Sequence, residues 1–272
     1  MSSLFSNKKS NKSHQLTTTS STKSSHNKTT LSSSTSSTLT KSHPTKSNAI
    51  TNSSSSSSST PSLNAPLKFT GCAQFRQRIV MATLCNKRIR IDNIRDKEEY
   101  PGLRPFEASF LRLIESLTNG CQIEINETGT ALRYAPGIII GGNSIEHDCG
   151  STRSIGWFIE GILPLLPFAK KSTEITFTGI TNDDIDLSID TLRFIHIPLL
   201  SLFGIKDGVS LELTSRGSAP LGGGKAILTC ANVRELRPIN LIDEGFIKRI
   251  RGIAYTSRVS PQNANRIVDG AR

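Results

Sequence analysis

A repeated order of strand-like and helix-like segments is the feature that most constrains the fold of this chain. From residue 67 onward a short strand, a helix, a second strand, a second helix and two further strands follow one another, and the same order then recurs. A period of about 2 marks each strand and a period of about 3.6 marks each amphipathic helix. The repetition predicts an α+β fold of tandem β-α-β-α-β-β units, in which helices pack against mixed sheets.

The first unit is expected to place its strands at residues 68–71, 88–95, 122–126 and 131–134. Its first helix is expected near residues 73–84. Its second helix is marked by four apolar residues spaced at i, i+3, i+4 and i+7, namely Phe110, Leu113, Ile114 and Leu117. Pro105 suits the first turn of that helix, and Gly120 ends it.

The second unit is expected to begin with a strand at residues 138–140, followed by a helix over 155–162 and a strand at 174–178. A long helix is expected from Asp183, because acidic residues favour the positive N-terminal end of a helix. Pro198 should kink or shorten this helix, since proline cannot donate a backbone hydrogen bond.

A third unit is expected to start after Arg237. Residues 238–250 mix strand and helix signals, residues 252–255 favour a strand, and Ser260-Pro261 is a good helix start. The sequence ends about three turns into that helix. We therefore expect a truncated chain or a fragment.

Composition separates an N-terminal tail from the rest of the chain, and the repeat pattern divides the rest, which gives three predicted domains. Residues 1–66 are mostly Ser, Thr, Asn and Lys, and they contain no acidic residue. They cannot bury enough apolar surface to offset chain entropy, so they should form a disordered tail. Residues 67–237 hold two repeats, and residues 238–272 hold the start of a third repeat or of a small inserted α/β domain. Seven of the eleven net positive charges belong to the tail, so the remaining chain is only mildly basic.

The closing hairpin of the second unit turns at residues 216–224, Arg-Gly-Ser-Ala-Pro-Leu-Gly-Gly-Gly. Successive glycines are costly in backbone entropy, and a chain tolerates them where its backbone must approach another backbone or an anion closely. Arg216 at the other end of the turn favours an anion. The turn is not a nucleotide-binding P-loop, because Ala219 and Ala226 stand where that motif needs a glycine and a Ser or Thr.

No signal peptide is expected, because no apolar stretch follows Met1, and no membrane helix is expected, because no run approaches the roughly 18 apolar residues that such a helix needs. The five cysteines are scattered and never form a Cys-x-x-Cys pair, which is typical of reduced, buried thiols in a cytosolic or nuclear protein. Residues 146–149, Glu-His-Asp-Cys, could suggest a metal or Cys-His site. Consecutive residues of an extended segment point to opposite faces, so we expect an ordinary loop or edge strand and no metal.

Five short motifs together resemble the RNA 3'-terminal phosphate cyclase family, over about residues 67–272. They are the turn at 216–224, Ile-Asp-Asn-Ile-Arg at 91–95, Pro-Gly-Leu at 101–103, Arg-Tyr-Ala-Pro-Gly at 133–137 and Gly-Gly at 141–142. The resemblance implies repeated β-α-β-α-β-β units, like those of the C-terminal domain of translation initiation factor three, with a small inserted domain. This agrees with the repeats predicted from the hydrophobic period.

Departures from the family pattern favour its cyclase-like branch. Residues 70–74 are Thr-Gly-Cys-Ala-Gln where active cyclases carry Glu-Gly-Gly-Gly-Gln. Residues 104–107 are Arg-Pro-Phe-Glu, which lack the His that active members carry after Pro-Gly-Leu and add a negative charge. Segments that resemble the cyclase-like branch lie at 75–80, 110–116 and 255–261.

That branch implies a non-catalytic ribosome-assembly factor of the nucleus and nucleolus, with no cofactor and no membrane partner. The expected partners are a ribosome-assembly GTPase, the small-subunit processome proteins and pre-rRNA, whose early cleavages it supports; direct RNA contact stays open. One alternative is an active ATP-dependent RNA 3'-terminal phosphate cyclase, which needs a nucleotide cradle and a nucleophilic histidine. A second is a nuclease, but the sequence supplies no carboxylate cluster or histidine pair for it.

Four arginines are the candidate anion- or RNA-binding residues, and no catalytic residue is predicted. Arg76, Arg95 and Arg216 match arginines that line the phosphate-binding groove of active cyclases, and a guanidinium offers a planar fork of donors to phosphate. Arg153, among hydroxyl residues before a helix, could add donors at the helix N-terminus. The alternative for the first three is a structural pair with a carboxylate across a repeat, and for the segment around Arg153 it is helix capping by the hydroxyls.

Overall fold

The computed structural model describes residues 65–205, 208–243, 245–257 and 259–272. The predicted tail at residues 1–66 therefore lies outside the described residues, apart from its last two positions. None of the helices that the structure describes is long and apolar enough to span a lipid bilayer.

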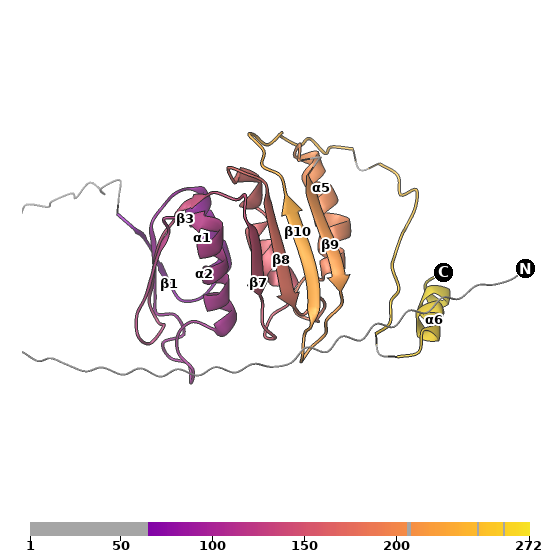
Figure 1. The fold of residues 1–272 in the computed structure, drawn as a ribbon, viewed down its shortest axis with the longest axis horizontal. Coiled ribbons are helices and arrows are strands. Elements are labelled where there is room, and N and C mark those ends of the chain that lie inside the picture. The colour runs from indigo at the N-terminus through magenta and orange to yellow at the C-terminus, as the bar shows by residue number, and fades with distance from the viewer. Residues whose placement is uncertain (1–64, 206–207, 244, 258) are drawn as a thin grey trace, which may run out of the picture. The chain divides into compact units, whose positions relative to one another are not determined.

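The first repeat has the element order that the sequence predicts. Its elements are β1 (Leu67–Thr70), α1 (Phe75–Leu84), β2 (Ile89–Asp92), α2 (Pro105–Leu117), β4 (Gln122–Ile125) and β5 (Leu132–Ala135). The sheet order is β1-β2-β5-β4, with β1 parallel to β2 and the other pairs antiparallel. Figure 1 shows α1 and α2 packed together on one side of this sheet.

The second repeat reproduces this topology. It contains β7 (Ser144–Asp148), α3 (Ile155–Ile162), β8 (Thr173–Gly179), a composite helix, β9 (Val209–Ser215) and β10 (Gly224–Cys230). The sheet order is β7-β8-β10-β9, again with one parallel pair followed by two antiparallel pairs. A short 3-10 turn, η1 (Leu166–Phe168), follows α3. The matching strand orders confirm the predicted α+β repeat fold (Figure 1).

One continuous core joins the two repeats through their helices. The predicted apolar stripe of α2 is buried, and Phe110 lies against Trp157 and Phe158 of α3 with ring centroids 5.4 and 6.5 Å apart. Gly161 allows this approach, because a Cβ there would lie 2.7 Å from both the Phe110 ring and the Arg76 side chain. Helix α3 of the second repeat therefore packs directly on the helices of the first.

The second repeat begins later than the sequence predicts. Residues 138–140, expected as its first strand, instead supply β6 (Ile138–Ile139), which pairs with β3 (Thr118–Asn119) in a separate two-stranded sheet. Gly141 and Gly142 then turn the chain with φ of 64° and 85°. The first strand of the repeat is β7, which pairs with β8 in parallel. Apolar periodicity located a real strand, but the two glycines place it before the repeat.

The long helix of the second repeat begins at Ile189 and not at Asp183. Asp183 accepts hydrogen bonds from the backbone N–H of Ile185 and Asp186 at 3.1 and 2.7 Å, so its carboxylate closes a turn instead of starting a helix. Ser188 is the N-cap residue. The helix runs through α4 (Ile189–Thr191), a π-helical segment η2 (Leu192–His196) and α5 (Ile197–Leu202). The wider π turn lies directly before Pro198, which has no backbone N–H to donate.

The segment that follows β10 has little regular structure. Residues 252–255, expected as a strand, form none. The helix expected after Ser260-Pro261 is present as α6 (Gln262–Ala271). The domain limits at 67–237 and 238–272, with a third repeat beginning in the latter, stay predictions. All five cysteines are free thiols; Cys85 is exposed, against the expectation of burial, whereas Cys149 and Cys230 are buried.

His147 lies on β7, which is an edge strand, and its ring is half-buried against Phe158 and Phe177. Its Nε2 lies 3.1 Å from the Ser109 hydroxyl. Burial lowers the pKa of His147 below the ordinary value of 6.5; Asp148 opposes this and Arg112 adds to it. Within the residues that the structure describes, no three His, Cys, Asp or Glu side chains gather as metal ligands.

We expect the His147 imidazole to make the fold sensitive to acid. A lowered pKa favours the neutral ring in the folded state, so this stability is present above the unfolded pKa of about 6.5 and is lost as the pH falls through the lower folded value. Urea unfolding at pH 7 and pH 5 should show a decline in the free energy of unfolding that is smaller in His147→Gln than in the wild type. Equal declines in the two proteins would contradict this assignment.

Candidate anion-binding cleft

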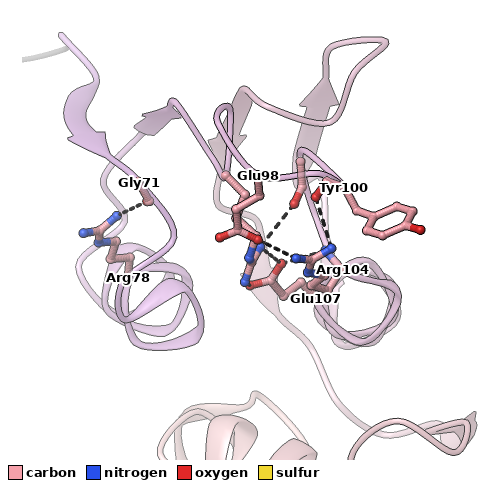
Figure 2. A network of polar contacts seen from close by, with 8 residues as sticks. Gly71, Arg78, Glu98, Tyr100, Arg104 and Glu107 are labelled. Carbon is pink, nitrogen blue, oxygen red and sulfur yellow. Dashed lines mark hydrogen bonds and ion pairs between the residues drawn. The ribbon is translucent and has the colours of Figure 1, made fainter.

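The turn after β1 exposes a carbonyl, rather than backbone N–H groups, to an arginine. Gly71 has a φ of 72°, and its N–H donates to the carbonyl of Asp92 at 2.8 Å. The Gly71 carbonyl accepts a hydrogen bond from Arg78 of α1 at 2.8 Å (Figure 2). A phosphate cradle needs several backbone donors that point at the anion. In this turn the Gly71 N–H is already bonded to Asp92, and the Gly71 carbonyl is bonded to Arg78. The Gly71 N–H is therefore not available to a phosphate.

Arg95 is held by a carboxylate from its own repeat. Its two terminal nitrogens donate to the two oxygens of Glu107 at 2.7 and 2.8 Å, and one also reaches the Gly102 carbonyl at 3.2 Å. The side chains of Arg95 and Glu107 are 13% and 4% exposed. The paired hydrogen bonds raise the pKa of Arg95 above its ordinary value, although burial acts the other way. The pair is therefore a buried, bidentate ion pair.

Glu107 also closes the N-terminus of α2. Its Oε2 accepts a hydrogen bond from the backbone N–H of Arg104 at 2.8 Å, and the Glu107 N–H donates to the Arg104 backbone carbonyl at 3.0 Å (Figure 2). A helix N-terminus beside an arginine is a favourable place for a phosphate oxygen, because N–H groups and the helix dipole both attract negative charge. Here the carboxylate of this chain occupies that place. Arg104 itself is drawn outward to Glu98 at 2.5 Å and to the Tyr100 carbonyl.

Arg76 links the two repeats. It lies on α1, is buried, and donates to the Trp157 carbonyl and to Glu160 of α3, the latter at 2.6 Å. Its guanidinium also stacks over the Trp157 ring at 4.8 Å. Every contact reaches across the repeat boundary. The structural alternative considered for this residue, a carboxylate partner across a repeat, is therefore present in the fold.

Arg153 precedes α3 and lies beside two aromatic rings that contact each other edge to face. Its guanidinium lies 5.2 Å from Phe106 and 5.6 Å from Trp157, and one nitrogen is 3.4 Å from Asp186. Burial raises the pKa of Asp186, while its hydrogen bond from the Ser154 N–H acts in the opposite direction. The Ser154 hydroxyl has no partner among the described residues, so capping of α3 by that hydroxyl is wrong. Asp186 reaches the helix start instead.

Three of the four predicted arginines converge on one cleft of about 580 Å³. Arg76, Arg95 and Arg153 enter it from different segments, and their carboxylate partners are Glu107, Glu160 and Asp186. Phe106 and Trp157 supply its apolar wall. Three cations and three anions leave the cleft with no net formal charge. A polyanion would have to displace the carboxylates or would be repelled by them.

Arg216 lies away from the lining of this cleft. It stands directly after β9 and makes a bidentate pair with Asp190 at 2.7 and 3.0 Å. Its guanidinium also lies 3.8 Å from the centre of the Tyr255 ring. The hydrogen bonds to Asp190 raise its pKa above the ordinary value. Each of the four predicted arginines thus has a carboxylate partner, and their binding of an anion stays a prediction.

The glycine turn at residues 216–224 serves a close approach of backbone to backbone. A Cβ on Gly217 would lie 2.1 Å from the Gly224 nitrogen and 2.6 Å from the Gly179 carbonyl oxygen. The Gly217 carbonyl accepts a hydrogen bond from the Thr181 N–H at 2.9 Å. The glycines could serve a close backbone contact or an anion, and the structure shows the close backbone contact. The negative group beside Arg216 is the carboxylate of Asp190.

Comparison with known proteins places these features in a family context. The protein-family model described as RNA 3'-terminal phosphate cyclase matches residues 67–269 of this chain. A probable RNA 3'-terminal phosphate cyclase-like protein of Dictyostelium discoideum is 55% identical over 206 residues, which cover 76% of this chain and 56% of that protein. An RNA 3'-terminal phosphate cyclase-like protein of Homo sapiens is 51% identical over 208 residues, covering 76% and 55%.

A protein named as an rRNA processing protein in Saccharomyces cerevisiae is 46% identical over 206 residues, covering 75% of this chain and 55% of that protein. The chain thus spans about half the length of the curated relatives it matches. The family match extends over both repeats and beyond them to α6. Because the match covers most of the sequence, this chain belongs to the RNA 3'-terminal phosphate cyclase family.

Proposed function

We propose that this protein is a non-catalytic member of its family that acts in rRNA processing. Its place would be the nucleolus, in the small-subunit processome, where it supports early pre-rRNA cleavage together with a ribosome-assembly GTPase. The name of the yeast relative supports the rRNA processing role, and the names of the amoeba and human relatives are those of cyclase-like proteins. The proposal extends to the whole protein what those names say of its relatives.

The observation that carries the proposal is the ion pair between Arg95 and Glu107. The arginine that would bind a phosphate is already satisfied by a buried carboxylate, which also accepts the Arg104 N–H at the start of α2. The phosphates of a nucleoside triphosphate would be repelled by the carboxylates of Glu107, Glu160 and Asp186, which line the same cleft. Glu107 and Asp186 are buried whereas Glu160 is partly exposed, and bringing several negative charges next to buried carboxylates costs several kcal/mol unless further cations compensate them.

The turn after β1 supports the same conclusion. Cys72 and Gln74 lie in the cleft lining where a bare backbone would have to face an anion. Gln74 has a left-handed φ of 52° and caps α1 without a side-chain hydrogen bond. The structural role of these residues is to turn the chain into α1. We propose that the cleft persists as a rigid joint between the repeats.

Incubation of the protein with labelled ATP, Mg²⁺ and an RNA that ends in a 3'-phosphate tests the proposal. We expect no covalent adenylate and no cyclised RNA end, under conditions in which an active cyclase gives both. Either product would overturn the proposal and favour the active cyclase instead. As a positive readout, tagged protein should be recovered with pre-ribosomal particles and a GTPase; absence from such particles would contradict the rRNA processing role alone.

A further inference from the structure

The outward face of the first sheet carries a row of cations. Lys68 of β1 is paired in register with Arg90 of β2, and Arg90 is paired with Arg133 of β5. Because side chains alternate along a strand, these three side chains lie on the same face, opposite the buried residues that pack on α1 and α2. Neighbouring strands are about 4.8 Å apart, so the three positive groups span about 10 Å across the sheet.

A shallow hollow lies over this row. Its volume is about 310 Å³, and its lining includes Lys68, Arg88, Arg90 and Arg133 but only one carboxylate, that of Glu124. A second hollow of about 320 Å³ adjoins it, shares Arg88 and adds Lys87. We call the surface formed by Lys68, Arg88, Arg90 and Arg133 the basic sheet face. It is separate from the cleft between the repeats.

Fold stability does not account for the basic sheet face. Like charges directly opposite each other on neighbouring strands are destabilising. Arg90 is compensated by Asp92 at 2.8 Å, but Glu124 reaches Arg133 only at 3.4 Å, with both side chains about two-thirds exposed. Such surface pairs contribute about 0 to 1 kcal/mol. Within the part of the chain that the structure describes, Lys68 and Arg88 make no ion pair.

The corresponding face of the second repeat has the opposite charge. Its outward positions include Glu146 of β7, Glu174 of β8 and Glu212 of β9, with Lys225 as the cation of β10. The two repeats share one topology, so the fold itself does not require a basic face. Solubility would be served by either sign. The positive row is therefore a property of the first repeat alone.

We propose that the basic sheet face binds the phosphate backbone of RNA. The exposed guanidinium groups of Arg88 and Arg133 and the exposed ammonium group of Lys68 offer forked and point-like donors to successive phosphates, and the half-buried Arg90 adds to the positive charge. Tyr134 lines the hollow but is buried, so the face presents no aromatic platform for stacking bases. Binding is consequently independent of sequence. The inference rests on the proposed function only for the choice of RNA as the polyanion.

Fluorescence anisotropy with a labelled single-stranded RNA tests this assignment. The variant Lys68→Ala/Arg88→Ala/Arg133→Ala is expected to bind RNA at least about tenfold more weakly than the wild type. The slope of log affinity against log salt should become shallower by about 2, since each lost phosphate contact on a single strand removes about 0.7. Because the three replaced side chains are exposed, the variant should keep the fold of the wild type, and circular dichroism checks this.

A matched control removes the same charge elsewhere. Arg112, Lys170 and Arg193 are exposed and lie outside the basic sheet face, so their combined change to Ala should leave both affinity and salt slope close to wild type. The N-terminal lysines are present in every variant and contribute equally. Glu124→Gln removes the one carboxylate of the hollow and should tighten RNA binding, an effect of opposite sign that misfolding does not produce.

Three outcomes would overturn the assignment: equal RNA affinity of the two triple variants, no RNA binding by the wild type, or no gain in Glu124→Gln. Binding of polyglutamate as tight as that of RNA, lost in the same variant, would identify an acidic protein partner instead. The assay contains neither ATP nor pre-ribosomal particles. Its failure therefore leaves the tests of the proposed function unaffected, and their failure leaves this result standing.

Discussion

Glu107→Gln is expected to lower the free energy of unfolding by about 3 to 5 kcal/mol, the range observed when one partner of a buried ion pair is removed. The change leaves the Arg95 guanidinium buried with an amide in place of a carboxylate, and it weakens the cap on the Arg104 N–H. Chemical denaturation of the variant and of the wild type measures the difference.

Two further variants separate a specific pair from a general effect of charge. Glu124→Gln removes an exposed partner of Arg133 and should cost at most about 1 kcal/mol. The double change Arg95→Met/Glu107→Leu should recover much of the loss, because replacing both partners by apolar groups leaves no unpaired charge. A Glu107→Gln variant as stable as wild type would show that the pair does not hold the cleft.

Inorganic phosphate gives the same variant a second readout. If Glu107 stands where an anion would bind, phosphate should raise the melting temperature of Glu107→Gln more than that of wild type, because a ligand that binds only the folded state stabilises it. An equal rise in the two proteins would mean that Arg95 is not an anion site that Glu107 blocks.

Gly217→Ala is expected to cost about 3 kcal/mol of unfolding free energy, because the added methyl group meets backbone atoms and not a flexible side chain. The new Cβ would lie 2.1 Å from the Gly224 nitrogen and 2.6 Å from two carbonyl oxygens. Either the hairpin between β9 and β10 opens or β8 moves. Thermal and urea unfolding measure the loss.

Two other glycines calibrate this result. Gly223→Ala meets no atom within 4 Å but has a φ of 80°, so only the strain of about 1 to 2 kcal/mol for a left-handed residue applies. Gly252→Ala meets no atom and has an ordinary φ, and it should be nearly neutral. A loss at Gly217 no larger than at Gly223 would contradict the close packing described for this turn.

The predicted elements that succeeded were those with a sustained apolar period. The α2 stripe was placed correctly because that helix has one apolar face that must be buried, and α3 was placed correctly because it is apolar and buried on nearly every side. Asp183 misled the prediction because the same carboxylate that favours a helix start also closes a turn, and only the packing of the chain decides between them. The strand at Ile138 was real, but it pairs with β3 in a separate two-stranded sheet and not in the sheet of the second repeat.

The arginines of the cleft were predictable individually, but their partners were not. Glu107 stood out in the sequence as an added negative charge, but it lies 12 positions from Arg95 in a separate motif, and nothing in either motif predicts their pairing. Glu160 meets Arg76 across 84 positions of the sequence, and no local pattern predicts that contact. Arg216 was grouped with the others by motif resemblance, yet it pairs with Asp190 outside the cleft. Long-range pairing is a property of the folded chain, which hydrophobic periods do not encode.

The contacts of Arg76 with α3 affect how the molecule unfolds locally. One guanidinium on α1 holds a carbonyl, a carboxylate and an indole ring of the other repeat. If one repeat opened separately, the Arg76 guanidinium would lose these partners. Amide hydrogens of both helices should therefore become accessible in the same event, and the two repeats should behave as a single foldon although each has its own sheet.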